Sequence, residues 1–230
     1  MGTEKKNIGK LFDSIASTYD RFNHVTSLGI DIYWRRKAIK KMQPVGHMLD
    51  VAIGTADLAL CALRKKKAQR VTGIDLSQEM MTLGQKKVER AGYGQQVEFV
   101  LGSALEMPFG DNSFEALTCA YGIRNFSDLD QGLREMHRVL AEDGQLVILE
   151  FSYPKNPVIR FFYNLYFSHI MPLIGRLLSK NPGAFTYFMN SVKNFIWGEE
   201  MLEHLRQAGF RDATYKTMTF GITTLYLARK

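Results

Sequence analysis

Cysteine is scarce in this sequence of 230 residues, which contains only Cys61 and Cys119. Both lie inside apolar patterns, so we expect reduced thiols and a cytoplasmic protein rather than a disulfide framework. Low-complexity tracts and internal repeats are also missing, and residues 1–10 are polar and basic, unlike a signal peptide. These absences exclude a disulfide-stapled, fibrous or repeat protein and favour a single α/β domain over residues 1–230.

Metal-ligand clusters are absent as well, because no group of His, Cys and Asp residues has the required spacing. We therefore expect no metal. The net charge is +7, and the basic residues gather in two groups within residues 35–41 and 64–67. Such groups are typical of solvated helix faces, and they also suit an anionic membrane surface or a nucleic acid. Charge alone does not choose between these surfaces.

Apolar periodicity predicts a helical region followed by alternating strands and helices. Residues 8–42 have apolar residues at helical intervals, which predicts an N-terminal helical cap over residues 1–45. The next elements are expected as strands at 47–52, 70–75, 97–101, 114–120 and 145–151, and helices at 58–67, 77–91 and 129–140. This alternation predicts a parallel, doubly wound sheet with helices on both faces.

The pattern breaks over residues 153–198, which are rich in aromatic residues and contain four prolines. This stretch predicts an inserted helical cap. A helix at 199–208 and two strands at 210–215 and 219–228 complete the chain, and we expect the last strand to be antiparallel.

The turn after the first strand carries the first ligand signal. It reads Leu49-Asp50-Val51-Ala52-Ile53-Gly54-Thr55-Ala56-Asp57. Ligands bind beyond the carboxyl ends of the strands in such sheets, and Gly54 allows the backbone to approach one closely. Two acids beside the turn, Asp50 and Asp57, would repel a pyrophosphate and suit a cation. S-adenosylmethionine carries an ammonium and a sulfonium, so it is the cofactor we expect.

Three further strand ends fit the same cofactor. Asp75 ends the second strand, 21 positions after Gly54, where an acid can accept hydrogen bonds from both ribose hydroxyls. Ser103 and Ala104 follow the third strand and suit the adenine, and Tyr121 follows the fourth, beneath the expected methyl group. This spacing also fits a nicotinamide cofactor, but the acids near Gly54 and the missing G-x-G-x-x-G pattern count against that alternative.

Several motifs resemble those of the ubiquinone/menaquinone biosynthesis C-methyltransferases, which have the class I methyltransferase fold. They are Phe12-Asp13-Ser14-Ile15-Ala16-Ser17-Thr18-Tyr19-Asp20, Tyr121-Gly122-Ile123-Arg124-Asn125, Leu149-Glu150-Phe151-Ser152 and Met171-Pro172-Leu173-Ile174-Gly175. The first turn departs from the family pattern, because Ile53 and Ala56 replace two glycines. The resemblance implies S-adenosylmethionine contacts from Thr55, Asp75, Ser103, Ala104 and Tyr121, beside Gly54 and Asp57.

The same resemblance implies methylation of a ring carbon of demethylmenaquinol, with a benzoquinol as the alternative substrate. The aromatic cap independently suggests a polyprenyl tail. Because charged and proline residues interrupt the cap, we expect it to lie peripherally on the inner face of a membrane rather than to span it. No nucleic-acid partner is expected, and the oligomeric state is left open.

Arg124 is the candidate catalytic residue, with Asn125 as an orienting donor. A quinol hydroxyl has a pKa near that of tyrosine, about 10, and its loss of a proton makes the adjacent carbon electron-rich. A guanidinium beside that oxygen would favour the anion. Water, His169, His24 or Tyr19 is the candidate proton acceptor.

Two rival functions follow from other features. The basic charge fits an RNA or protein methyltransferase, but the fourth strand ends in Thr118-Cys119-Ala120-Tyr121 and lacks the Asp-Pro-Pro-Tyr-like step of many amino-group methyltransferases. Cys119 is expected to pack inside its strand rather than to act as a nucleophile. The substituted turn at Ile53 and Ala56 fits a module that keeps the fold and has lost catalysis.

Overall fold

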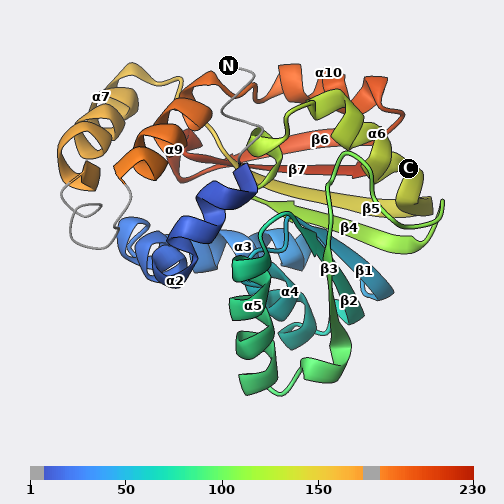
Figure 1. The fold of residues 1–230 in the computed structure, drawn as a ribbon. Helices are drawn as coiled ribbons and strands as arrows, with labels where there is room; N and C mark the ends of the chain where they lie inside the picture. The colour runs from blue at the N-terminus through green and yellow to red at the C-terminus, as the bar shows by residue number, and fades with distance from the viewer. Residues whose placement is uncertain (1–7, 173–181) are drawn as a thin grey trace.

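The computed structural model describes residues 8–172 and 182–230, apart from the side chains of residues 182–185. Within these residues a seven-stranded sheet has the order β3-β2-β1-β4-β5-β7-β6 (Figure 1). The strands are β1 (Val45–Val51), β2 (Ala68–Asp75), β3 (Val97–Leu101), β4 (Phe114–Ala120), β5 (Leu140–Phe151), β6 (Arg211–Met218) and β7 (Thr223–Arg229). Strands β1 to β5 pair in parallel, whereas β7 is antiparallel to β5 and β6. The predicted doubly wound sheet with an antiparallel last strand is confirmed.

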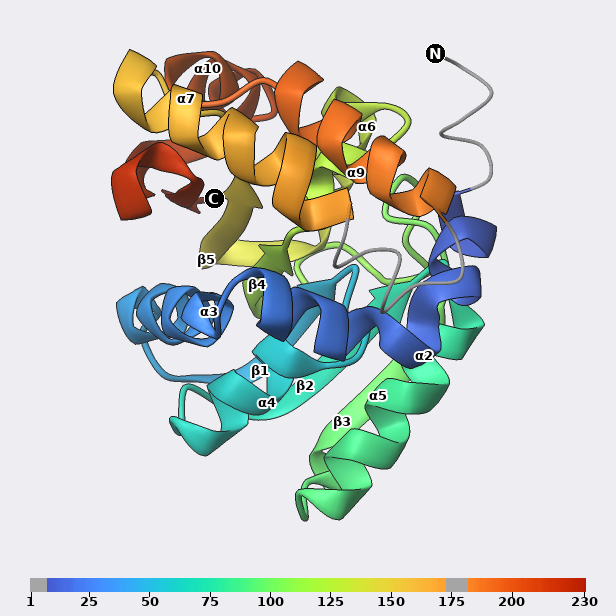
Figure 2. The same cartoon turned by 90° about the vertical axis from the view of Figure 1, so that its left-hand side faces the viewer.

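Helices cover both faces of this sheet (Figures 1 and 2). One layer consists of α3 (Ile30–Lys41), α4 (Asp57–Arg64) and α5 (Gln78–Arg90), and the other of α6 (Leu129–Val139) and α10 (Glu199–Gln207). Neighbouring residues of β1 show the two layers, because Met48 packs with Ile39 and Leu60, and Leu49 packs with Leu133. The central strands are largely apolar because most of their residues are buried on both faces of the sheet.

The predicted N-terminal helical region consists of two helices, α2 (Ile8–Thr26) and α3. The chain turns at Leu28 and Gly29, whose φ angles are 51° and 75°. This left-handed conformation ends a helix and favours glycine, and the Gly29 N–H donates to the carbonyl of His24 at 2.9 Å. Helical spacing predicted the extent of the region and missed the break at Gly29.

Three other boundaries test the sequence interpretation. The helix expected at 77–91 is confirmed, and its first turn is capped by the Ser77 hydroxyl, which accepts a hydrogen bond from the Met80 N–H at 3.2 Å. β5 begins at Leu140 rather than 145, since Leu140 pairs with Phe114 before a shift in register. The last strand begins at Thr223 rather than 219, because η4 (Thr219–Gly221) is a turn with positive φ angles.

The helices of the inserted region lie with α2 beyond the carboxyl ends of the strands (Figures 1 and 2). They are α7 (Pro157–Leu165), the π-helical η3 (Tyr166–Ile170) and α9 (Pro182–Asn194). Tyr163, Phe167 and Met171 form a small core with Phe22 of α2 and Phe188 of α9. The motif that begins at Met171 continues outside the described residues. None of the helices described is both long and apolar enough to span a bilayer.

Gly73 of β2 provides a test of the packing beneath the first turn. A Cβ at Gly73 would lie 2.1 Å from the Cδ1 atom of Ile53, so Gly73→Ala should destabilise the fold by about 1–3 kcal/mol. Ile53→Ala removes the clashing side chain, and the double variant should lose less stability than the sum of the single variants. Urea unfolding measures all three, with Gly94→Ala as a control whose Cβ would make only an ordinary contact of 3.4 Å with Glu89. Additive losses would contradict the packing described.

Candidate active site

The first turn, between β1 and α4, leaves its backbone accessible to a ligand at the carboxyl edge of the sheet. Ala52, Gly54 and Ala56 have φ angles of 57°, 54° and 65°. A Cβ at Gly54 would have no atom within 4 Å, so the turn leaves space at this position. Ala56 adopts a conformation that favours glycine, which explains why a glycine suits this position in the related motif. Ile53 turns inward and packs over Gly73.

Asp75 links this turn to the next one. Its Oδ2 atom accepts a hydrogen bond from the Gly54 N–H at 2.8 Å, and its Oδ1 atom accepts one from the Ser77 N–H at 2.9 Å. Burial raises the pKa of Asp75, and these backbone donors oppose that shift. Each carboxylate oxygen can accept a second hydrogen bond, so Asp75 retains the capacity to hold a pair of ribose hydroxyls.

A small cavity of about 120 Å³ lies over these strand ends. Five of the predicted cofactor residues line it, and they are Gly54, Asp75, Ser103, Ala104 and Tyr121. Asn125 lines it too. Because ligand pockets of this kind usually measure about 300–1,000 Å³, the cavity must widen before a nucleoside cofactor fits completely.

Helix α2 restricts this cavity from above. Ile8, Gly9, Phe12 and Tyr19 of α2 contribute to its lining. Gly9 lies so close to β2 that a Cβ would come within 2.9 Å of the Leu76 carbonyl oxygen. Movement of α2 is therefore the simplest way to widen the cavity.

Thr55 and Asp57 line neither this cavity nor the larger one described below. The Thr55 hydroxyl donates to Asp20 Oδ1 at 2.6 Å and accepts from Lys87 Nζ at 3.1 Å. Lys87 also pairs with Asp20 and, at 2.8 Å, with Asp57. Arg35 contacts Asp57 at 3.6 Å. These residues form an ion-pair network that holds α2 against the first turn, and their predicted contact with the cofactor stays a prediction.

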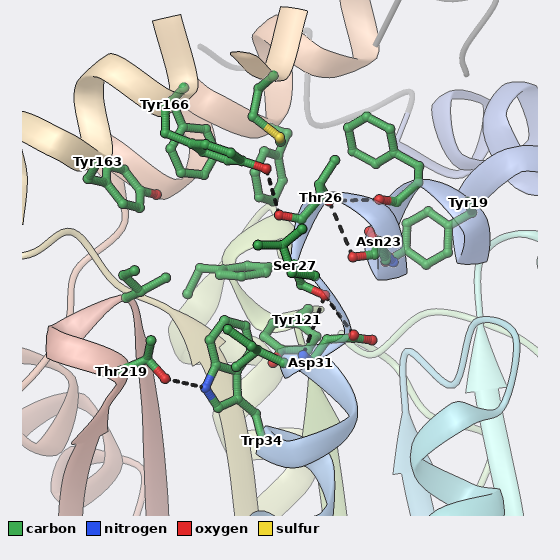
Figure 3. A pocket seen from close by; sticks show the side chains of 18 of the residues that line it. Tyr19, Asn23, Thr26, Ser27, Asp31, Trp34, Tyr121, Tyr163, Tyr166 and Thr219 are labelled. Carbon is green, nitrogen blue, oxygen red and sulfur yellow. Dashed lines mark hydrogen bonds between the residues drawn. The ribbon is translucent and has the colours of Figure 1, made fainter. Parts of the chain in front are cut away.

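A large cavity of about 640 Å³ lies beside the small one, between α2, α3 and the inserted helices (Figure 3). Its walls are mostly aromatic or aliphatic, and Figure 3 shows Tyr163 and Tyr166 on one side and Trp34 and Tyr121 on another. The Tyr166 hydroxyl donates to the carbonyl of Thr26 at 2.7 Å, which ties η3 to α2. Such a cavity suits a ligand with a large apolar surface.

Phe12, Tyr19 and Tyr121 line both cavities and therefore mark the place where they meet. Tyr121 has a φ angle of 60°, its ring stacks on Phe151 with a centroid distance of 4.4 Å, and the Arg35 guanidinium lies 5.4 Å from its centroid. The hydroxyl of Tyr121 is buried, which raises its pKa. It makes no hydrogen bond of good geometry with the described residues, although the Thr223 side chain lies close enough to oppose that shift of the pKa. A buried hydroxyl without a well-placed partner at this junction indicates a position where a ligand can form a better hydrogen bond.

Arg124 lies in η2 (Ile123–Asn125), after β4, and it lines the large cavity. It is buried, and its Nη1 atom pairs with Glu150 Oε1 at 2.9 Å and also donates to the Tyr121 carbonyl. Its Nε atom donates to Ser191 of α9 at 3.2 Å. The other terminal nitrogen, Nη2, makes no hydrogen bond with the described residues. Burial raises the pKa of Glu150, and the Arg124 charge opposes that shift.

Asn125 follows Arg124 but lines the small cavity instead of the large one. Its Oδ1 atom accepts a hydrogen bond from the Tyr187 hydroxyl of α9 at 2.9 Å. This leaves the amide nitrogen of Asn125 as its donor toward a ligand, in keeping with the predicted orienting role.

The candidate proton acceptors lie in different places. Tyr19 lines both cavities, and burial raises its pKa while Arg124 opposes that shift. His24 lines neither cavity, and its Nδ1 atom lies 2.9 Å from Asp31 Oδ2. His169 is exposed on η3. Among the three side chains, only Tyr19 is placed to contact a ligand in either cavity.

Four charged residues of this region escaped the sequence interpretation as site residues: Asp20, Asp31, Lys87 and Glu150. Asp31 lines the large cavity and accepts a hydrogen bond from the Ser27 hydroxyl at 2.7 Å. Burial raises the pKa of Asp31, but the Ser27 hydroxyl and the Arg35 charge together lower it by more, so the net pKa is below the usual value. The available signal was an acid beside apolar residues in the short stretch Ser27-Leu28-Gly29-Ile30-Asp31.

Cys119 packs inside β4, as expected. Its side chain is fully buried, and burial raises the pKa of its thiol well above the usual value. A thiolate nucleophile is therefore disfavoured at this position. Groups of three or more His, Cys, Asp or Glu residues that could hold a metal ion are absent from the described part of the chain.

Comparison with known proteins places this site in a family context. The whole chain, residues 1–230, matches the model of the ubiE/COQ5 methyltransferase family. It is 40% identical over 231 residues to a demethylmenaquinone methyltransferase of Bacteroides fragilis, covering 100% of this chain and 94% of that protein. It is 42% identical over 232 residues to the ubiquinone/menaquinone biosynthesis C-methyltransferase UbiE of Geotalea daltonii, covering 99% and 98% of the two chains.

A solved structure supports the fold assignment. The S-adenosylmethionine-dependent methyltransferase of Thermotoga maritima, described as a possible histamine N-methyltransferase, superposes with a TM-score of 0.68. Its sequence is 18% identical, and the match covers 96% of this chain and 99% of that one. The likeness shows that the class I methyltransferase fold predicted from the sequence is correct.

Asp75→Ala should weaken S-adenosylmethionine binding about 10- to 100-fold or more, because each hydrogen bond to a charged acceptor contributes about 1.5–3 kcal/mol. Calorimetric titration measures the dissociation constant. Ser77→Ala is the control for loop and helix packing, since the Ser77 hydroxyl caps α5 and donates to Asp13 of α2 but does not line the small cavity. Equal weakening in both variants would mean that Asp75 acts only by holding the loop.

Asp50 should make folding stability depend on pH. It is buried on β1, its Oδ1 atom accepts from Thr118 at 2.6 Å, and its Oδ2 atom has no partner of good hydrogen-bond geometry among the described residues. Burial raises the pKa of Asp50 to about 7, so the folded state favours the protonated form. Asp50→Asn mimics that form at every pH. The free energy of unfolding of the variant should therefore rise relative to that of the wild type as the pH increases from about 4 to about 7, by about 4 kcal/mol at most. Denaturant unfolding across this range measures the difference, and a constant difference would contradict the assignment.

Proposed function

Because the chain belongs to the ubiE/COQ5 methyltransferase family, we propose that it acts as a single methyltransferase domain that transfers a methyl group from S-adenosylmethionine to a ring carbon of demethylmenaquinol. One observation carries this proposal, namely that a small cavity lined by cofactor-type residues meets a large apolar cavity at Phe12, Tyr19 and Tyr121. The two reactants would approach one another at that junction.

The residues around the small cavity fit S-adenosylmethionine. Gly54 leaves open space at the turn, Asp75 keeps acceptor capacity for the ribose, and Ser103 and Ala104 complete the wall where an adenine would lie. Tyr121 offers a buried hydroxyl without a well-placed partner among the described residues beside this wall. When bound, the cofactor would supply a methyl group on a sulfonium, whose sulfur is an excellent leaving group. The chain must then only align the acceptor carbon and make it more nucleophilic.

The large cavity fits a polyprenylated quinol. Its apolar walls would hold the naphthalene ring and the first units of the tail, while Arg124, Asp31 and Tyr19 supply polar groups for the hydroxyls. A benzoquinol is the second candidate, since the name of the Geotalea daltonii relative covers both ubiquinone and menaquinone biosynthesis. A nucleic-acid substrate is not expected, because bases need polar edges to recognise them and this cavity offers few.

Arg124 is assigned to the quinol oxygen. Glu150 and the Tyr121 carbonyl hold its Nη1 atom, so Nη2 is the group left to stabilise the phenolate that makes the ring carbon reactive. Asn125, on the cofactor side of the same short helix, orients the reacting groups. Methyl transfer to a ring carbon releases one proton overall. A water molecule beside Tyr19 would accept that proton, because burial raises the pKa of Tyr19 and keeps its hydroxyl protonated.

The proposed activity is tested with a short-tail demethylmenaquinol and a short-tail benzoquinol, each kept reduced and supplied with S-adenosylmethionine. Mass spectrometry should find one added methyl group on a ring carbon of the naphthoquinol and a stoichiometric amount of S-adenosylhomocysteine. Exclusive methylation of the benzoquinol would move the assignment to the second candidate. Binding of cofactor without turnover of either quinol would contradict the proposal.

Removal of the Arg124 charge should slow turnover rather than weaken cofactor binding. Arg124→Ala alone would leave Glu150 buried without its partner, at a cost of about 3–5 kcal/mol, so the sharper variant is Arg124→Gln combined with Glu150→Gln. Loss of one preorganised donor lowers kcat by roughly 100-fold or more. The dissociation constant of S-adenosylmethionine should barely change, because Arg124 lines the large cavity and not the small one.

Two further measurements distinguish this catalytic role from a structural one. Raising the pH should partly restore turnover in the charge-free variant, because more quinol is then ionised in solution. Arg124→Lys should recover only part of the rate, since lysine keeps the charge but lacks the planar fork. Cofactor binding that weakens as much as kcat falls would show that Arg124 is structural.

A further inference from the structure

The mouth of the large cavity is surrounded by exposed apolar side chains. Leu28, Ile30, Phe162 and Phe220 all line the cavity, yet they are 83%, 38%, 59% and 77% exposed. They come from the α2–α3 turn, α3, α7 and η4, which are far apart in the sequence. We refer to these four residues as the rim. Apolar groups that are exposed and gathered around one opening indicate an interaction surface.

The elements that carry the rim are apolar beyond it. Ile32 and Tyr33 of α3 and Val158, Phe161 and Leu165 of α7 are also exposed. Helix α7 is inverted relative to an ordinary surface helix, because Tyr163 is its only buried side chain while most of its large apolar residues face solvent. Among the exposed large apolar side chains of the described residues, only Leu76 and Leu101 lie outside α2, α3, the turn between them, α7, η3 and η4.

The exposed charged residues of α3 and α7 are all basic. Arg36, Lys37, Lys40 and Lys41 are exposed on α3, and Arg160 is exposed on α7. The acid among the residues of α3, α7, η3 and η4 is Asp31, which is buried and paired with Arg35. An apolar surface bordered by lysine and arginine is the composition of segments that lie in a membrane interface, where each basic residue near anionic lipid contributes about 1 kcal/mol.

We propose that the rim, with α3 and α7, docks on an anionic lipid bilayer, so that the large cavity opens directly into the acyl region. A second copy of the chain fits this face poorly, because two basic surfaces would repel one another. The polyprenyl tail of the expected substrate also favours a lipid bilayer at this face, an argument that rests on the proposed function. A cavity of about 640 Å³ holds a ring and part of a tail, so the rest of a polyprenyl chain must leave through the mouth. Only an apolar medium outside the rim would solvate it.

Vesicle flotation tests this proposal with the full chain and no substrate. Wild type should float with vesicles of phosphatidylcholine and phosphatidylglycerol, bind less at high salt, and bind vesicles of phosphatidylcholine alone more weakly. The variant Phe161→Ser/Lys37→Glu should bind the anionic vesicles at least 10-fold more weakly. Neither residue lines a cavity, so the variant tests the surface and not the site.

The matched control is Leu101→Ser/Lys65→Glu, which removes a side chain of comparable exposure and makes the same charge change on β3 and after α4. It should bind the anionic vesicles as the wild type does. Absence of wild-type binding, or equal weakening in the two variants, would overturn the proposal. Sedimentation that shows self-association lost in Phe161→Ser/Lys37→Glu, without vesicle binding by the wild type, would also overturn it and assign the face to a second copy.

Turnover separates this proposal from the proposed function. Methylation of a soluble short-tail quinol should be equal in wild type and in Phe161→Ser/Lys37→Glu, whereas methylation of a long-tail quinol embedded in vesicles should fall at least 10-fold in the variant. Vesicle binding without turnover of either quinol would refute the proposed function and leave the docking surface intact. Equal loss with both quinols would contradict a role of the surface in substrate entry.

Discussion

The ion pair between Arg124 and Glu150 joins the sheet to the helices that cover it. Glu150 is the second-last residue of β5, and its two oxygens accept from Arg124 Nη1 and from the N–H groups of Phe151 and Arg124. Arg124 in turn reaches Ser191 of α9 and lies over the rings of Phe151 and Phe188. Burying two charges is costly, and such a pair is retained only when further hydrogen bonds satisfy both groups. The position of α9 over the large cavity therefore depends on the same pair that presents Arg124 to a ligand.

Helix α2 is held by carboxylates rather than by a deep apolar core. Asp13 accepts from the Ser77 hydroxyl and, at 3.2 Å, from the Glu79 N–H, and Asp20 contacts Thr55 and Lys87. Such polar contacts exchange with water at a modest net cost, of about 0.5–3 kcal/mol each. The same helix lines both cavities and makes the small one too tight for a nucleoside. A boundary made of polar contacts can open and close again, whereas a boundary made of buried aromatic rings would have to break its core to do so.

Local patterns in the sequence predicted the fold well, because strand and helix periods and the acid ending β2 are properties of short segments. The break at Gly29 and the early start of β5 depended on backbone conformations and on pairing with distant residues. The same distinction applies to the site. Gly54, Asp75, Ser103 and Ala104 follow successive strands, so sheet topology brings them together. The network of Asp20, Thr55, Asp57 and Lys87 joins three separate helices and a turn, and no spacing in the sequence encodes it.

Tyr121 shows how the two halves of the site constrain one another. A tyrosine with a φ angle of 60° is strained, and surrounding structure must hold it in place. Its N–H donates to the Leu149 carbonyl at 2.7 Å, its own carbonyl accepts from Arg124, and its ring lies between Phe151 and Arg35. Gly122 must follow, because a Cβ there would come within 2.5 Å of the Ala52 side chain in the first turn. The strain thus places one aromatic ring between the two cavities, with the first turn on one side and Arg124 on the other. A ring fixed in that position sets the distance at which groups bound in the two cavities can meet.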